Sequence, residues 1–170
     1  MTFWRNYYHL VWETYQRAPL LVPSIESELY AFMIDHSAEF EVYVYAIGGN
    51  EDHLHLVAAI PPNLSVSEIV KTLKQASAAY INDLLPPNHP TLDWQRGYGC
   101  MTIGEGQLAI AVNYVKSQSL LHADNQTNAW LERADTQDEG PSDPGLSPKI
   151  AALLRERQSD YHIEMGDPPF

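Results

Sequence analysis

The amino-acid sequence predicts an α+β fold, a split β-α-β arrangement in which helices cover one face of an antiparallel sheet. Three observations predict this fold. Short segments rich in β-branched and aromatic residues alternate with segments whose apolar residues recur at helical spacing. The expected elements follow the order β-α-β-β-α-β-α. The chain has 170 residues, which suits one domain with a proper core but not two.

The first half of the chain contains three expected strands and one helix. Residues 7–14 are rich in aromatic and β-branched side chains, which favour a strand. Residues 23–35 begin with Pro-Ser and then carry apolar residues at helical spacing. Residues 40–47 alternate between two faces, and residues 53–60 return as the partner strand. Between them, Gly-Gly-Asn at 48–50 has the composition of a turn.

The second half adds two helices and a fourth strand. Ser65, with a glutamate three residues later, forms a predicted capping box for a helix that extends to about Leu84. The proline-rich residues 85–90 break the chain. Residues 97–103 are the expected fourth strand, and a helix over residues 105–122 follows.

The domain organisation follows from these elements. Residues 1–125 form the expected domain, and residues 126–146 are an expected acidic linker, because residues 134–143 carry four acids and no base. Residues 147–170 begin with Ser-Pro and are expected to form a short helix and a tail.

Composition restricts the function. The chain has 22 acidic and 10 basic residues, a formal charge of −12, so any contact with nucleic acid is expected to be local. The single cysteine excludes an intrachain disulfide and a cysteine-rich zinc site. The sequence shows neither a long apolar run nor the features of a signal peptide, so we expect a cytoplasmic protein with no membrane contact.

Two histidines lie two residues apart on an expected strand. His53 and His55 share one face, because side chains alternate with a period of two, and Leu54 and Leu56 take the other face. One interpretation makes the histidines half-exposed polar residues. The other makes them ligands of a divalent metal, since imidazole is the commonest side-chain ligand. The spacing alone is a weak signal that cupins and zinc hydrolases share.

The last predicted helix carries a tyrosine away from its apolar stripe. Tyr114 lies about 160° around the helix from Val112, and Gln118 follows one turn later with Lys116 between them. The tyrosine is either an exposed surface residue or a group presented to a cleft, where the lysine contacts phosphate. A phenol is protonated near neutral pH, so it needs a metal or a base nearby to act as a nucleophile.

A few basic residues could form a local surface for DNA. Lys71 and Lys74 are one helical turn apart, and Arg96 precedes the fourth strand. They form either a solvated face or a small basic strip for a hairpin stem. Trp94 and Tyr98 either stack on unpaired bases or belong to the core.

Several short segments occur together in a characteristic order. They are residues 8–12, 17–19, 48–57, 65–67, 71–74 and 94–99, followed by Tyr114. In order and spacing they resemble the single-tyrosine HUH transposases, which are the small transposases of single-strand insertion sequences and their REP-associated relatives. The resemblance covers about residues 4–122.

The resemblance implies a ferredoxin-like or RRM-like fold and a homodimer whose active sites can be shared between subunits. It implies that His53 and His55, with Gln118 as third ligand, bind Mg²⁺ or Mn²⁺ without a nucleotide cofactor. Tyr114 matches the nucleophile that cleaves single-stranded DNA beside a hairpin, forming a 5′-phosphotyrosine and a free 3′-hydroxyl. Rejoining on another strand reverses that step.

The chain also departs from this family. Members are usually basic, and after the tyrosine they often continue with a stretch rich in histidine, lysine and arginine, which residues 119–124 do not reproduce. Two alternatives therefore stay open beside the transposase. One is a noncatalytic nucleic-acid-binding module of the same fold, either domesticated or decayed, and the other is a metal-dependent hydrolase.

Overall fold

The computed structural model describes residues 3–129 and 131–134. The chain divides into two compact units, Met1–Thr136 and Gln137–Phe170. The predicted C-terminal helix and tail, together with most of the predicted acidic linker, lie outside the described residues.

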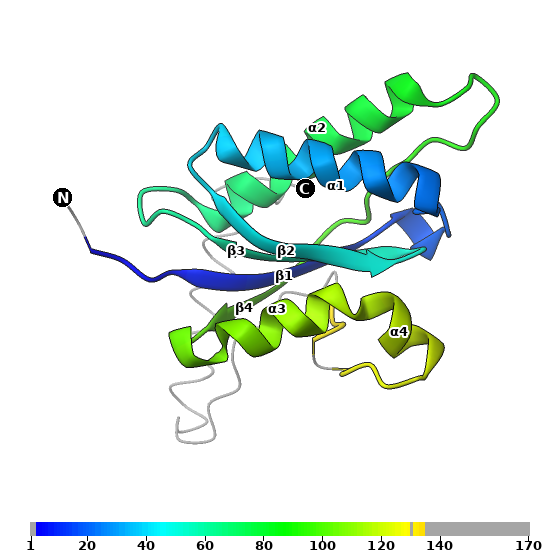
Figure 1. Cartoon of the computed structure of the whole chain (residues 1–170). Coiled ribbons are helices and arrows are strands. Elements are labelled where there is room, and N and C mark those ends of the chain that lie inside the picture. The colour runs from blue at the N-terminus through cyan, green and yellow to red at the C-terminus, as the bar shows by residue number, and fades with distance from the viewer. Residues whose placement is uncertain (1–2, 130, 135–170) are drawn as a thin grey trace, which may run out of the picture. The chain divides into compact units, whose positions relative to one another are not determined.

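Four strands form one antiparallel sheet. They are β1 (Tyr7–Glu13), β2 (Tyr43–Asn50), β3 (His53–Ala59) and β4 (Gly99–Ile103). Their order in the sheet is β2-β3-β1-β4, so β3 and β1 are central and every neighbouring pair is antiparallel (Figure 1). The predicted fold class is confirmed, because the order of elements gives the split β-α-β arrangement.

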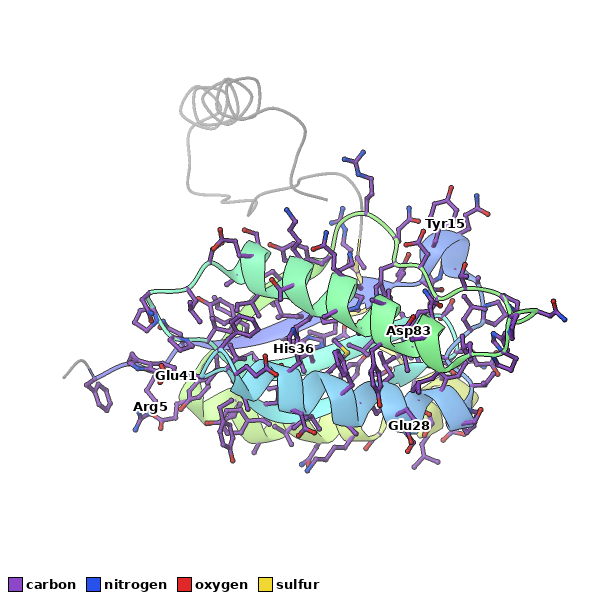
Figure 2. All side chains as sticks on the ribbon, turned by 90° about the horizontal axis from the view of Figure 1, so that it is seen from above. Arg5, Tyr15, Glu28, His36, Glu41 and Asp83 are labelled. Atoms are coloured by element: carbon purple, nitrogen blue, oxygen red, sulfur yellow. The ribbon has the colours of Figure 1, made fainter. Side chains whose placement is uncertain are left out.

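Two helices lie side by side over one face of the sheet, α1 (Pro23–Ala38) and α2 (Val66–Leu84) (Figures 1 and 2). Between them and the sheet lies the main apolar core. It includes Leu10, Trp12, Leu29, Met33, Leu54, Leu56, Leu73 and Ile81. Burial of these side chains drives this half of the fold, at about 25 cal/mol for each Å² removed from water.

The opposite face of the sheet is covered by α3 (Leu108–Lys116), followed by α4 (Gln118–Ala123) (Figure 1). The prediction of helices on one face therefore holds for α1 and α2, whereas α3 packs on the other side. There Val115 and Val57 belong to a second, smaller core. As a result, all seven residues of β3 are buried, although its side chains alternate between the two faces.

The turn between β2 and β3 differs from the prediction. Gly48 and Gly49 belong to β2, which ends at Asn50, and the turn falls on residues 51–52. Both glycines are needed for close approach, because a Cβ on Gly48 would collide with the carbonyl oxygen of Val115, and one on Gly49 would collide with the backbone of β3. Glycine composition indicated a turn here, but packing explains it.

Two predicted helical features also differ. The helix expected over residues 105–122 is a 3₁₀ turn, η2 (Glu105–Gln107), followed by α3 and α4, which are separated at Ser117. The predicted capping box does not form, since the hydroxyl of Ser65 contacts that of Ser67. Among the described residues, we find no helix long and apolar enough to cross a membrane.

Candidate active site

Two histidines of β3 meet at one point on the face covered by α3. His53 and His55 alternate with Leu54 and Leu56, which lie in the core under α1 and α2. The Nε2 atoms of both imidazoles lie 3.1 Å from the same atom, Oε2 of Glu132. Both rings are buried, with exposed fractions of 1% and 0%. The period of two along the strand brings them together.

Each imidazole is held through its other ring nitrogen. His53 Nδ1 lies 2.6 Å from Asp52 Oδ1, and Arg17 Nε donates to Asp52 Oδ2 at 2.9 Å. His55 Nδ1 lies 2.9 Å from His9 Nε2, and these two rings stack with centroids 5.0 Å apart. Such partners fix ring orientation in metal-binding histidines. Here they leave both Nε2 atoms directed to the same carboxylate.

Tyr114, on α3, and Gln118, at the start of α4, contact the same carboxylate through its other oxygen, Oε1. The Tyr114 hydroxyl donates a hydrogen bond to Glu132 and accepts one from the backbone N–H of Asn128 at 3.1 Å. Gln118 Nε2 donates to Glu132 Oε1 at 3.5 Å. The structure thus brings together the four residues that the sequence proposed as metal ligands and nucleophile.

The amide oxygen of Gln118 stands out within this group. Gln118 is 1% exposed, and its Oε1 has no hydrogen-bond partner in the described part of the chain. A buried oxygen without a partner costs free energy, and in folded proteins such atoms are usually satisfied by water or an ion. The site therefore contains an oxygen acceptor that is suited to a cation.

Sequence reasoning missed two residues of this group. Glu132 falls within residues 126–146, which the acidic composition indicated as a linker. His122 lies on α4, and its Nε2 is 3.0 Å from His53 Nε2 and 3.5 Å from Glu132 Oε2. The signal for His122 was present, since it follows Gln118 by one helical turn. No local pattern in the sequence indicated Glu132.

The backbone of residues 131–134 brings Glu132 into the site. The carbonyl oxygen of Arg133 lies so close to Gly99 of β4 that a Cβ at this glycine would collide with it. Ala134, at the end of the segment, is buried. The first compact unit, Met1–Thr136, includes this segment.

Burial and hydrogen bonding shift the pKa values of the site in opposite directions. Burial works to lower the pKa of His53, but hydrogen bonds to Asp52 and Glu132 raise it to about 9. Burial lowers the pKa of His55. Burial works to raise the pKa of Glu132, yet the two histidines hold it well below its usual range. Burial, followed by the hydrogen bond to Glu132, raises the pKa of Tyr114, so its phenol is protonated.

The basic residues proposed from sequence differ in their surroundings. Lys116 and Arg96 are exposed, and Lys71 is half-buried. Lys74 is 6% exposed, and its ammonium donates to two backbone carbonyls of the loop before β4 at 2.7 and 2.8 Å. That geometry suits an ammonium that holds the loop in place. Trp94, a candidate for base stacking, lies in the main core.

The chemistry available to this group is specific. Imidazole nitrogens and amide and carboxylate oxygens are suitable ligands for a divalent cation. A tyrosine hydroxyl beside them is a nucleophile once it loses its proton. The fold and this grouping of histidines, amide and tyrosine are those that the resemblance to transposases led us to expect.

Comparison with known proteins identifies the family. The family model described as "Transposase IS200 like" matches residues 2–118, and the chain belongs to this family. A curated relative, the ISDra2 transposase TnpA of Deinococcus radiodurans, is 29% identical over 115 residues. That alignment covers 65% of this chain and 82% of the relative.

Two solved structures share the fold. One is a putative transposase from Deinococcus radiodurans, with a TM-score of 0.55 and 23% identity, covering 76% of this chain and 97% of that one. The other is a REP-associated tyrosine transposase bound to a REP hairpin, with a TM-score of 0.54 and 14% identity, covering 86% and 100%.

Proposed function

We propose that this transposase cleaves and rejoins single-stranded DNA at hairpin-flanked sites in a metal-dependent reaction, through a 5′-phosphotyrosine on Tyr114. The observation that supports this most strongly is the convergence at one carboxylate. The Tyr114 hydroxyl, the Nε2 atoms of His53 and His55 and the amide of Gln118 all lie around Glu132. A nucleophile and candidate metal ligands in one place are what such a reaction requires.

The donors present fit Mg²⁺ or Mn²⁺. His53, His55 and Gln118 would hold the ion, since two imidazole nitrogens point to one place and the Gln118 oxygen there lacks a partner among the described residues. A bound divalent ion supplies Lewis acidity that polarises a scissile phosphate. The set contains no thiolate, which agrees with metals that prefer nitrogen and oxygen.

In the covalent step, Tyr114 is the attacking group and the side chains around it receive its proton. The Tyr114 oxygen forms a bond to phosphorus as the bond from phosphorus to the 3′-oxygen breaks. The phenolic proton, which is directed to Glu132 in this structure, has to leave, and the departing 3′-oxygen takes up a proton. The raised pKa of Tyr114 means that the phenol starts protonated, so attack depends on the groups around it.

The proposed DNA surface is small. Arg96 and Lys116 are exposed and Lys71 is half-buried, which suits local contacts with phosphate. Lys74 is the weakest member of the predicted set, because its ammonium already binds two carbonyls. That a similar fold has been solved with a REP hairpin supports a hairpin as the substrate.

We also propose a homodimer, whose active sites can be shared. On α3 and α4, Ile110 and Leu120 are 70% and 69% exposed, and they offer apolar surface for a second subunit. Light scattering at micromolar concentration is expected to give about twice the chain mass. A clean monomer would contradict the dimer and leave the reaction to the residues of one chain.

The decisive experiment for the reaction is an adduct assay. Wild-type protein is incubated with labelled single-stranded hairpin DNA and Mn²⁺ and then resolved by denaturing electrophoresis. We expect a DNA-linked band that disappears in Tyr114→Phe, because this change removes only the hydroxyl. The control is Tyr98→Phe, at a half-buried tyrosine packed against the main core, and it should keep the band.

A band that persists in Tyr114→Phe would show that another residue is the nucleophile. The second candidate function is a noncatalytic nucleic-acid-binding module of the same fold, domesticated or decayed. The net charge of −12 favours a loss of strand transfer, because an excess of acid weakens the DNA binding that cleavage requires. DNA binding by the wild type without an adduct on several hairpins would support that candidate.

A further inference from the structure

We infer that Glu132, together with His122, belongs to the metal centre, so that its ligand set is larger than the two strand histidines and Gln118. The inference deepens the proposed function and rests on it, since it concerns the ion that the reaction would use. Three candidate ligand atoms, one each from His53, His122 and Glu132, lie within 4.8 Å of one another.

The spacing of the candidate ligand atoms is that of ligands around one metal ion. Ligands bound at about 2.1 Å from one metal ion are about 3.0 Å apart at right angles and about 3.4 Å apart in a tetrahedron. In this site, Glu132 Oε2 lies 3.1 Å from His53 Nε2, 3.1 Å from His55 Nε2 and 3.5 Å from His122 Nε2. The Nε2 atoms of His53 and His122 are 3.0 Å apart. The three separations among His53, His122 and Glu132, and the separation of Glu132 from His55, match those between ligands of one ion.

The charge of Glu132 also suits a metal centre. Three imidazoles with only nitrogen donors carry no negative charge, and a divalent cation is bound more favourably when an anionic oxygen joins them. Glu132 provides that oxygen, since its carboxylate Oε2 lies 3.1 Å from the Nε2 atoms of both His53 and His55. The side chain is only 17% exposed, so its charge is weakly screened by water.

The Gln118 side chain supports a metal centre independently of Glu132. The amide oxygen of Gln118 is buried beside this cluster without a partner among the described residues. Hydrogen bonds between the carboxylate and the histidines leave that oxygen unsatisfied, whereas a cation bound beside this amide, whose nitrogen lies 3.5 Å from Glu132 Oε1, would satisfy it. A metal centre therefore explains both the imidazole–carboxylate grouping and the Gln118 oxygen.

The arrangement also links the metal centre to the nucleophile. Glu132 faces the imidazoles with Oε2, while Oε1 accepts the hydrogen bond of the Tyr114 hydroxyl. One carboxylate therefore holds the phenol beside the ligands. The close approach of Arg133 to Gly99 fixes the backbone that carries this carboxylate.

The test is Mn²⁺ affinity, measured by calorimetry on the full-length chain without DNA. In Glu132→Gln we expect the dissociation constant to rise at least about 10-fold, since loss of supporting groups alone typically costs 10- to 100-fold. His122→Ala should also bind more weakly. The matched control is Glu39→Gln, which alters a second Glu–His pair, with His36, at the C-terminal end of α1. It should bind Mn²⁺ like the wild type.

A second variant distinguishes the loss of a ligand from misfolding. Glu132→Asp keeps the charge but shortens the side chain by one methylene, and circular dichroism checks that each variant is folded. We expect Glu132→Asp to bind Mn²⁺ between the wild type and Glu132→Gln. Unchanged affinity in Glu132→Gln would overturn the inference. Tighter binding would overturn it as well, because the carboxylate would then compete with the ion.

The outcomes separate this inference from the proposed function. A wild type that forms the DNA adduct while Glu132→Gln keeps its Mn²⁺ affinity overturns only the role of Glu132. A wild type whose Mn²⁺ affinity depends on Glu132 but that forms no adduct supports the metal centre and contradicts strand transfer. A wild type that binds no Mn²⁺ overturns both.

Discussion

The two faces of the sheet are built from the same strands but differ in chemistry. Under α1 and α2, the strands contribute side chains such as Leu10, Leu54 and Leu56 to a continuous apolar core. Under α3, the same strands contribute His9, His53 and His55, and the apolar cluster there is small. Alternate residues of a strand therefore have different roles, because one face stabilises the fold and the other carries the candidate site. Substitutions of neighbouring residues should affect either stability or metal binding, but not both.

The largest expected effect comes from the histidine face. His55→Ala removes one candidate ligand and leaves the core face unchanged, so Mn²⁺ binding and the DNA adduct should fall by about 100-fold or more, consistent with the loss of a directly bound ligand. Calorimetry and denaturing electrophoresis measure the two effects. Near-normal Mn²⁺ binding would contradict the division between the faces.

The matched substitution on the other face is Leu56→Ala, one residue along the same strand. Leu56 is fully buried, so truncation should lower the free energy of unfolding by about 2–5 kcal/mol. Urea denaturation measures this loss. At a temperature where the variant is folded, Mn²⁺ affinity should stay within about 2-fold of the wild type, which is our expectation for a site on the opposite face. A large loss of affinity would show that the two faces are coupled.

A smaller effect concerns Lys74, a charged group on the core side. Burial lowers its pKa from 10.5 to about 8, against the attraction of Asp93. Below pH 8 the lysine is charged in both the folded and unfolded states, and the cost of burying it is fully present. Between pH 8 and 10.5 the folded state releases its proton while the unfolded state retains it, so this group makes stability rise with pH.

Lys74→Met should remove that contribution. We expect the difference in urea midpoint between wild type and Lys74→Met to shift in favour of the wild type as the pH rises from 8 to 10. Tyrosine ionisation affects both proteins equally and cancels in the comparison. A difference that does not change with pH would contradict the lowered pKa.

Much of this molecule follows from patterns of short range. The period of two along β3 predicted that His53 and His55 share a face, and helical spacing predicted that Gln118 lies near Tyr114. Both relations depend only on residues close in sequence, so they hold even where the predicted bounds of an element are wrong. The break at Ser117 divides the predicted helix but leaves Tyr114 and Gln118 at the same carboxylate.

Features that depend on distant contacts were not predictable in this way. From composition, Gly48 and Gly49 were interpreted as a turn. The sequence does not show that the backbones of Val115 and β3 pass close to them, which is the reason that these positions need glycine. Lys74 was expected on a basic strip, since helical spacing does not reveal the carbonyls of a later loop. Glu132 was assigned to a linker by composition, and only the folded chain places it among the histidines.

The position of Glu132 along the chain has a practical consequence. The family match ends at residue 118, and the domain boundary suggested by composition is residue 125. A shortened protein that ends at either point keeps Tyr114, His53, His55 and Gln118, yet it lacks the carboxylate around which they gather. Truncated proteins prepared for binding or cleavage assays should therefore extend at least through Ala134, the buried residue that ends this segment.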